Sequence, residues 1–253
     1  MNGMELLEKM ELVESAYVEE ADAPPVRRRR VRGVWAAAAC VCLLLGALLW
    51  PRSGTITPEP QVGDFELSEG TTAKVTVGIE GDVGARIVDL VWLTEEELFR
   101  QEGLYAFRGR VSGLTNVTLD FNGEKEIRCI ATVAVEKVYC GEVEEGEQIA
   151  MLLPCPAGVS GQLWIEDTDT ASRIESGMEG IFMPWAYLED TCWKQNGATL
   201  MLRDLASCGL ADGLRWMFLQ TDEGLVYEKS AYPGADGAVT LDDIESYVVK
   251  MLG

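Results

Sequence analysis

Residues 126–138 read EIRCIATVAVEKV, a long run rich in Ile, Val and Thr of the kind that strands favour. The run follows Asn122-Gly123, the dipeptide preferred at the corner of a two-residue β-hairpin. VTLDF at residues 117–121 precedes this corner, and YAFRGRV at residues 105–111 comes earlier. The pattern therefore predicts a hairpin at the centre of a strand-rich domain.

Further short strands are expected on both sides of the hairpin. They are predicted at residues 71–78, 85–93, 161–167, 180–188, 198–205, 215–221 and 224–232, with another in GEVEEGEQIAMLLP after residue 140. Gly109 inside FRGRV would allow the sharp coil that a strand needs in a small barrel. This succession of strands resembles the small Greek-key barrels of the OB type. The alternating apolar residues are interpreted as barrel core and not as a ligand-binding set.

Two helices are expected around these strands. Thr94 with Glu97 three residues later has the capping-box spacing of a brief helix that ends near Gly103. Thr240 with Asp243 has the same spacing before a final helix at residues 241–252. The apolar face of that helix is predicted to comprise Ile244, Tyr247, Val248 and Met251.

A different kind of segment, VWAAAACVCLLLGALLW, occupies residues 34–50 and carries no charge. As a helix it would reach about 25 Å, a little short of the ~30 Å hydrocarbon core of a bilayer. Residues suited to the membrane surface lie at its ends or just before it, namely Arg27, Arg28, Arg29, Arg30, Arg32, Trp35 and Trp50. The stretch therefore predicts one transmembrane helix. A cleaved signal peptide, a lipoprotein signal at Cys40 and a buried soluble helix are the alternatives.

The distribution of charged residues predicts the orientation of this span in the membrane. The arginines precede it and acids dominate after it, so the positive-inside rule places the N-terminus in the cytoplasm and the C-terminal domain outside the cell membrane. The chain has a formal charge of −21, and residues 1–33 contribute only −1 from seven acids and six bases, which leaves −20 for the remainder. Such an acidic outer domain repels phosphate backbones, so we expect no nucleic-acid partner there.

These features divide the chain into four parts. Residues 1–33 form a cytoplasmic amphipathic segment with a basic flank, 34–50 the span, 51–70 a linker, and 71–253 the extracytoplasmic domain. The predicted fold class is α+β, with one transmembrane helix and a strand-rich outer domain that has an OB-like small barrel core and a C-terminal helix. The lipid bilayer is the first expected partner.

The N-terminal tail has the pattern of a short amphipathic helix. Leu6, Met10, Val13 and Tyr17 recur at helical spacing, with glutamates on the other faces. A lone helix of this length is marginal in water, so residues 4–20 are predicted to dock a cytoplasmic regulatory protein through this apolar stripe. The alternative is a disordered tail that merely precedes the span.

The stretch MELLEKMELVESAYVEEAD at residues 4–22, followed by basic residues, a span and an acidic outer domain, resembles membrane-anchored anti-sigma-factor-like and uncharacterised single-pass proteins of Gram-positive bacteria. The resemblance implies that the tail holds a transcription factor at the membrane while the outer domain senses something. The chain departs from the better-defined anti-sigma families in its short tail of about 33 residues. It also lacks the zinc-binding His and Cys pattern that some of those families carry.

Catalytic signatures are tested by their absence. The chain has no histidine, which removes the commonest general base and His-activated nucleophiles, and it lacks GxSxG, P-loop and GxGxxG motifs. We therefore expect a protein that is not an enzyme and has no cofactor or metal. Asp236 to Asp243 resembles half of a calcium loop and is interpreted as a turn followed by a helix cap. Five outer cysteines are interpreted mainly as small buried residues, with a disulfide framework as the alternative.

The function predicted from the sequence is a single-pass membrane protein whose acidic outer domain binds or senses a ligand and whose cytoplasmic helix docks a regulatory partner. An alternative is an extracytoplasmic surface binding module, calcium-dependent or not, with an incidental tail. A third interpretation is a carboxylate-pair hydrolase, because such chemistry needs only Asp and Glu.

Overall fold

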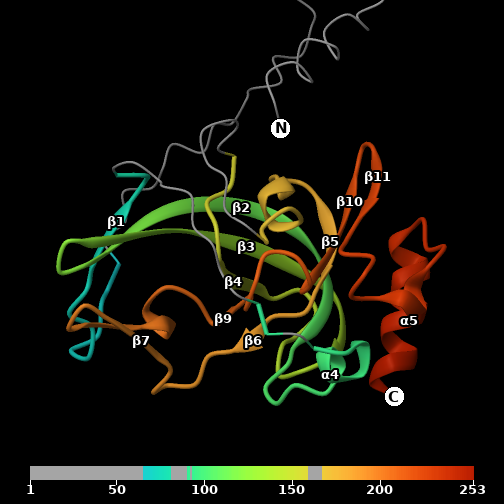
Figure 1. The fold of residues 1–253 in the computed structure, drawn as a ribbon, viewed down its shortest axis with the longest axis horizontal. Coiled ribbons are helices and arrows are strands. Elements are labelled where there is room, and N and C mark those ends of the chain that lie inside the picture. The colour runs from blue at the N-terminus through green and yellow to red at the C-terminus, as the bar shows by residue number, and fades with distance from the viewer. Residues whose placement is uncertain (1–64, 81–89, 92, 159–166) are drawn as a thin grey trace, which may run out of the picture. The chain divides into compact units, whose positions relative to one another are not determined.

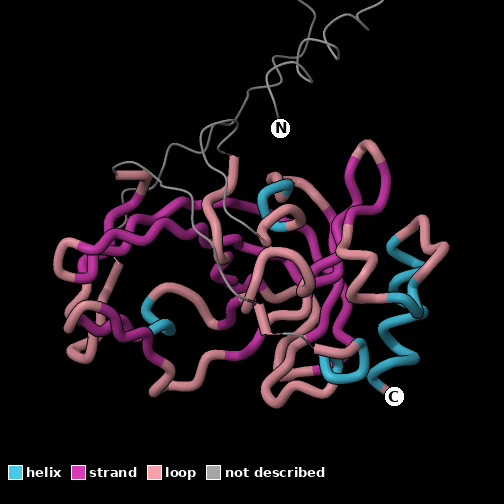
Figure 2. Tube along the Cα trace, in the orientation of Figure 1, coloured by secondary structure: helices cyan, strands magenta, loops and turns pink. Residues whose placement is uncertain are grey.

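The computed structural model describes residues 65–80, 90–91, 93–158 and 167–253, all within one compact unit (Figure 1). The expected strand-rich domain with a C-terminal helix is confirmed, and strands and loops dominate Figure 2. The predicted span at residues 34–50 lies outside the described residues. Among those that are described, no helix is long and apolar enough to cross a bilayer.

Eleven strands are found among the described residues. They are β1 (Lys74–Val77), β2 (Ala106–Phe121), β3 (Glu124–Cys140), β4 (Gln148–Leu153), β5 (Glu179–Phe182), β6 (Trp185–Ala186), β7 (Cys192–Gln195), β8 (Ala198–Met201), β9 (Cys208–Gly209), β10 (Met217–Thr221) and β11 (Gly224–Val226). The helices are α4 (Glu95–Phe99) and α5 (Leu241–Leu252), with short 3₁₀ turns η1 (Ala171–Arg173), η2 (Leu202–Asp204) and η3 (Pro233–Ala235).

The predicted hairpin is confirmed and is longer than expected. β2 and β3 pair antiparallel along their whole length, from Ala106 opposite Cys140 to Phe121 opposite Glu124. Asn122 and Gly123 both have positive φ, 54° and 94°, as the favoured two-residue hairpin turn requires. The two strands predicted at residues 105–111 and 117–121 are one continuous strand, because β3 supplies backbone partners across the polar residues between them.

The hairpin organises a curled sheet in the order β11-β10-β5-β2-β3-β4-β9-β6. On the edge opposite β3, β2 pairs with two different strands. It pairs with β5 near Gly109 and with β1 near Leu119. Register shifts on either side of Gly109 bend the strand, as β-bulges do. The β6 end of the sheet curls back to the residues just before β2, because the Tyr105 N–H donates to Pro184 O at 2.8 Å beside the Leu104–Trp185 bridge. The result is the half-barrel seen in Figure 1.

Several predicted strands are shorter or interrupted. The strand expected at 180–188 is divided into β5 and β6 at Pro184, which has no N–H for a ladder bond. The strand expected at 224–232 ends at Val226, after which the chain enters turns leading to η3. The strand expected at 198–205 ends at Met201 and continues as η2.

Two other predicted strands fall mostly outside the described residues. Of the strand at residues 85–93, only Leu90, Val91 and Leu93 are described, and none of these is in a strand. The strand expected at 161–167 has only Asp167 described, and Asp167 also lies outside any strand. The structure therefore does not support a strand at either of these described positions.

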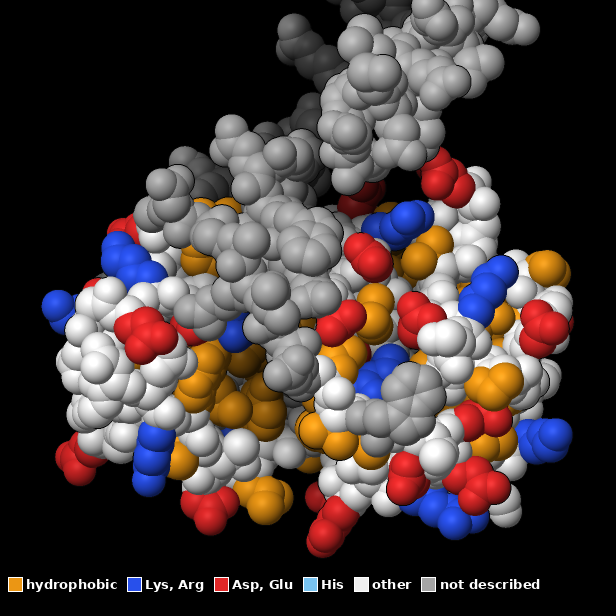
Figure 3. All heavy atoms as spheres, in the orientation of Figure 1, with side chains coloured by type: hydrophobic (Ala, Val, Ile, Leu, Met, Phe, Trp, Pro, Cys, Tyr) orange, Lys and Arg blue, Asp and Glu red, His pale blue; other side chains and the backbone are white. Residues whose placement is uncertain are grey.

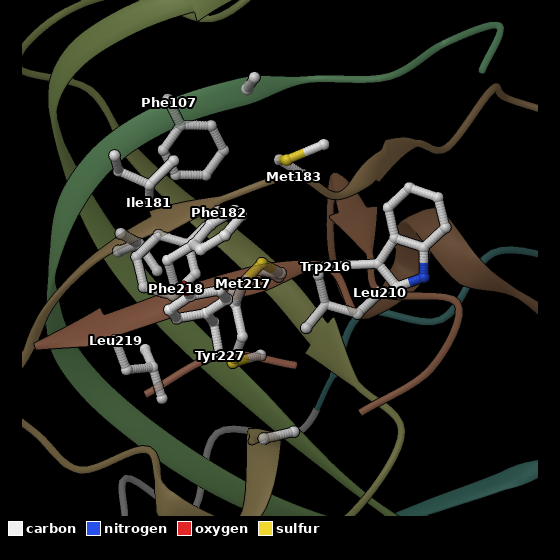
Figure 4. Packing of buried hydrophobic residues seen from close by; sticks show 14 of the residues in the cluster. Phe107, Ile181, Phe182, Met183, Leu210, Trp216, Met217, Phe218, Leu219 and Tyr227 are labelled. Atoms are coloured by element: carbon white, nitrogen blue, oxygen red, sulfur yellow. The ribbon is translucent and has the colours of Figure 1, made fainter. Parts of the chain in front are cut away.

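The main core lies inside the curl, where aromatic side chains of β2, β5 and β10 meet. Phe107 packs on Phe182 with ring centroids 5.8 Å apart, and Phe218 lies in the same cluster (Figure 4). α5 closes this core by burying Ile244, Tyr247 and Val248, while Met251 is only partly buried, so its predicted apolar face is confirmed. A second, smaller cluster lies around the distal half of the hairpin, between β1, β4 and β8.

Candidate functional site

A groove of about 200 Å³ lies between the β3–β4 face and the segment that carries β7. Its apolar lining is formed by Leu152, Leu153, Pro154, Leu202 and Leu210. Arg128, Tyr187 and Trp193 add the groups that can hydrogen bond or stack. We call this site the β3–β7 groove. Figure 3 shows a hollow with hydrophobic side chains between the β7 region and the region of β6 and β9.

The wall of the groove is the β7–β8 hairpin, which is fixed at its tip. Its turn, Asn196-Gly197, has positive φ at both residues, 44° and 73°, like the Asn122-Gly123 turn of the long hairpin. The two turns bond to each other. The Asn122 side-chain amide donates to Asn196 O, and the Asn196 amide donates to Phe121 O, both at 3.0 Å. The wall is thus held in place by bonds to the tip of the β2–β3 hairpin.

Trp193 and Arg128 form the centre of this wall and floor. The Arg128 guanidinium lies 4.8 Å from the centre of the Trp193 ring, and Phe121 packs on the same indole at 4.9 Å. Arg128 also lies 3.2 Å from Glu126, whose carboxylate is 1 % exposed. Gln195 Nε2 donates to the other Glu126 oxygen at 3.0 Å. A buried carboxylate needs such partners, so this ion pair is a structural feature that fixes both the hairpin wall and the cation.

Tyr187 crosses the floor of the groove directly over β9. A Cβ placed on Gly209 would lie 1.8 Å from the Tyr187 hydroxyl and 3.2 Å from Leu152 O, so only glycine fits beneath this ring. Burial raises the pKa of the Tyr187 hydroxyl, which therefore remains a proton donor at neutral pH. This hydroxyl makes no hydrogen bond within the described part of the chain, and it can therefore donate to a bound molecule.

The arrangement is suited to binding. It offers apolar contact, one hydroxyl donor and a fixed guanidinium, while Glu126 is already occupied by Arg128 and Gln195. Within the described residues, no group of three or more Cys, Asp or Glu side chains is placed to hold a metal ion. Asp243, part of the calcium-like segment, instead accepts a bond from Thr240 Oγ1 at 2.8 Å and completes the capping box of α5. The predicted cap is confirmed.

Two further hollows lie on the domain. A polar cleft of about 930 Å³ opens between the segment after η1 and the β10–β11 turn, and its Arg110 is engaged by Glu179 and Glu136. An apolar groove of about 490 Å³ lies beside α4. The five cysteines among the described residues are all free thiols, and Cys129, Cys155 and Cys208 are buried as small core residues.

None of the sequence-predicted site residues falls among the described residues. Leu6, Met10, Val13 and Tyr17 and the membrane-flanking residues from Arg27 to Trp50 are all outside the described residues. Arg128, Tyr187 and Trp193 are not among the site residues predicted from the sequence. Residues 192–201, CWKQNGATLM, contained a usable signal, because an Asn-Gly pair between two short runs predicts a hairpin.

No family model, curated protein or solved structure matches this chain. The geometry of the β3–β7 groove and the organisation of the sequence therefore carry the functional proposal.

Proposed function

We propose that this is a single-pass membrane protein with a cytoplasmic N-terminus, whose outer domain binds a glycan in the β3–β7 groove and whose cytoplasmic helix docks a regulatory partner. Membrane attachment is supported by the uncharged run at residues 34–50 beside five arginines. The observation that carries the binding role is the position of the groove on the curled sheet.

That position matches the binding face of an OB-like barrel. β2, β3, β4, the β5–β6 segment and β9 follow one another along the chain, and β4 pairs parallel with β9 while β6 returns to the start of β2. OB barrels bind their ligands on the face of the second and third strands, between the loops that join strands 1 to 2 and 4 to 5. The corresponding parts here are β3 and β4, the Asn122-Gly123 turn, and the connection that carries β7 and β8.

The chemistry of the lining favours a glycan among the ligands of such barrels. OB barrels bind oligonucleotides and oligosaccharides. The −20 charge of the outer segment opposes a phosphodiester, and the groove cation is already paired with Glu126. A sugar presents neutral hydroxyls and apolar ring faces. These match the Tyr187 hydroxyl, the Arg128 guanidinium and the leucine lining.

Calorimetric titration with a soluble oligomer of N-acetylglucosamine tests this assignment, using the full-length protein in phosphatidylcholine nanodiscs. Tyr187→Phe removes only the hydroxyl. The dissociation constant should therefore rise about fivefold to tenfold, which is the change expected for the loss of one neutral hydrogen bond. Tyr105→Phe removes a half-buried hydroxyl outside the groove and should leave the affinity unchanged. Equal effects of the two variants, or no heat up to about 1 mM sugar, would remove the groove as a glycan site.

The docking role of the tail rests on the stripe of Leu6, Met10, Val13 and Tyr17. A peptide of residues 1–33 should capture a cytoplasmic partner, and Met10→Asp should abolish capture because an unpaired buried carboxylate costs several kcal/mol. Glu11→Gln, on the polar face, should do little. If the wild-type peptide captures nothing, the surface-module interpretation with an incidental tail replaces the anti-sigma-like regulator.

A further inference from the structure

The groove beside α4 combines an apolar lining with an acidic rim. Its volume of about 490 Å³ falls within the ~300–1,000 Å³ of ordinary ligand sites. Leu90, Val91, Leu93, Leu214, Ala231 and Pro233 supply the apolar surface, and Val91 is 73 % exposed. We call this site the α4 groove. Among the residues that the structure describes, it shares no lining residue with the β3–β7 groove.

The cation in this lining, Arg215, is already neutralised by the domain itself. Its Nε and Nη2 donate to one oxygen of the buried Asp212 at 3.0 and 2.8 Å, and its Nη1 donates to Val91 O at 2.8 Å. Trp216 Nε1 donates to the same Asp212 oxygen at 2.7 Å. Arg215 therefore contributes no net positive charge that could attract an anionic ligand.

Three carboxylates remain, and each comes from a different segment of the chain. Glu95 is on α4, Asp167 precedes η1, and Glu228 follows β11. The bonds that Glu95 accepts from Gly234 N and Tyr247 Oη both end on Oε1, which leaves Oε2 for a bound molecule. Glu228 likewise accepts from Ser230 N through Oε1. The rim thus has a negative potential around an apolar floor.

We infer that the α4 groove binds a cationic amphipathic peptide. The apolar floor excludes a strongly hydrated polar cation as the preferred occupant, because that floor would remain unburied. The carboxylates belong to three separate segments of the chain, so a peptide with several basic side chains can engage them together, whereas a small cation would meet one. The −20 charge of the outer segment also steers cations toward this surface.

The test uses three synthetic peptides against the full-length protein in phosphatidylcholine nanodiscs, with empty nanodiscs as the blank. One is an amphipathic helix of lysine and leucine, the second replaces every lysine by glutamate, and the third replaces every leucine by serine. Thermophoresis should show the first peptide binding at least tenfold more tightly than either of the others.

Two sets of variants locate the site. Asp167→Asn with Glu228→Gln keeps both shapes and removes two rim charges, so affinity for the lysine–leucine peptide should fall about fivefold to tenfold. The matched control is Glu144→Gln with Glu145→Gln, two exposed acids in the β3–β4 turn that do not line the groove, and it should change affinity by less than about twofold. Val91→Ser, at an exposed position, should also weaken binding.

Four outcomes would overturn the inference. In the first, the lysine–serine peptide binds as tightly as the lysine–leucine peptide, which would indicate general charge attraction. In the second, the two charge variants lose equal affinity for the lysine–leucine peptide. In the third, Val91→Ser does not change the affinity, and in the fourth no peptide binds above the empty nanodiscs. None of these outcomes bears on the glycan titration, because the two grooves have separate linings.

Discussion

Replacing Gly109 by alanine should destabilise the domain, because β2 has no room for a side chain at this position beside a register shift. Gly109 pairs with Val135 of β3 on one side and with Gly180 of β5 on the other. A Cβ at position 109 would lie 2.5 Å from Ala134 O and 2.8 Å from Val133 Cγ1. The nearer atom belongs to the backbone of the neighbouring strand, so a rotamer change cannot relieve the contact.

The size of the effect follows from this distance. Ordinary contact to a Cβ begins near 3.4 Å, so β2 and β3 would have to separate by close to an ångström near the open end of the hairpin. Overpacking a buried site costs about 1–3 kcal/mol, and a clash with backbone belongs in the upper part of that range. We expect a loss of about 2–3 kcal/mol. With a urea slope of roughly 2 kcal/mol per molar, the unfolding midpoint should fall by about 1–1.5 M.

Gly113→Ala is the matched control in the same strand. A Cβ at position 113 would meet Thr132 Oγ1 at 3.9 Å, an ordinary contact, and the residue has no positive φ. This variant should leave the free energy of unfolding unchanged or raise it by up to about 1 kcal/mol, because alanine restricts the conformations of the unfolded chain. Urea titration followed by tryptophan fluorescence and circular dichroism compares the two. Equal midpoints for both variants would show that the bend at Gly109 is not what constrains β2.

Three further predictions concern α5 and the thiols. The hydrogen bond from Lys137 lowers the pKa of Glu245. The stability that the ionised Glu245 contributes is therefore present above the ordinary pKa of a glutamate and is lost as the pH falls through the lowered pKa. Glu245→Gln should flatten the acid side of a stability–pH profile by up to about 1 kcal/mol, and an unchanged profile would contradict this. Thr240→Ala removes the cap of α5 and should cost about 1 kcal/mol in urea titration, whereas Thr240→Ser should cost far less. Burial raises the thiol pKa to about 12 for Cys129, about 11 for Cys155 and about 12 for Cys208. Iodoacetamide at pH 8 should therefore modify Cys192 well before these three, and mass mapping that found Cys208 modified as fast as Cys192 would refute the burial argument.

The elements that could be predicted from the sequence are those decided by neighbouring residues. The hairpin at Asn122-Gly123 depends on a dipeptide that accepts positive φ, and α5 depends on Thr240 and Asp243 three residues apart. Both signals depend only on residues close together in the sequence, so they do not depend on contacts with distant parts of the chain. The strand at residues 180–188 shows the converse. The break at Pro184 depends on a single residue, but the two halves of the expected strand pair with different strands. β5 pairs with β10, and β6 pairs with β9.

The groove was missed for the same physical reason. The Asn196-Gly197 turn is a local signal for the β7–β8 hairpin, but its hydrogen bonds to the Asn122-Gly123 turn join residues more than seventy positions apart. Tyr187 gave no signal of its own, because its place on the floor depends on the absence of a side chain at Gly209 on another strand. Sequence periodicity describes each strand alone and cannot show which turns or faces meet.

One feature of β3 nevertheless distinguishes the part of the strand that supports the groove. Residues 126–131, EIRCIA, are covered on both faces, since Cys129 belongs to the main core and Ile130 to the second cluster. Two-sided burial explains why the run lacks strict alternation. Glu126 and Arg128 are charged residues inside such a run, two positions apart and therefore on one face. Charges are retained in a covered strand only when something pairs with them, and here Gln195 and Trp193 of β7 complete that pairing. A Glu-x-Arg pair within a run buried on both sides is thus the sequence feature that points to a covering segment, and the groove lies where that segment meets the sheet.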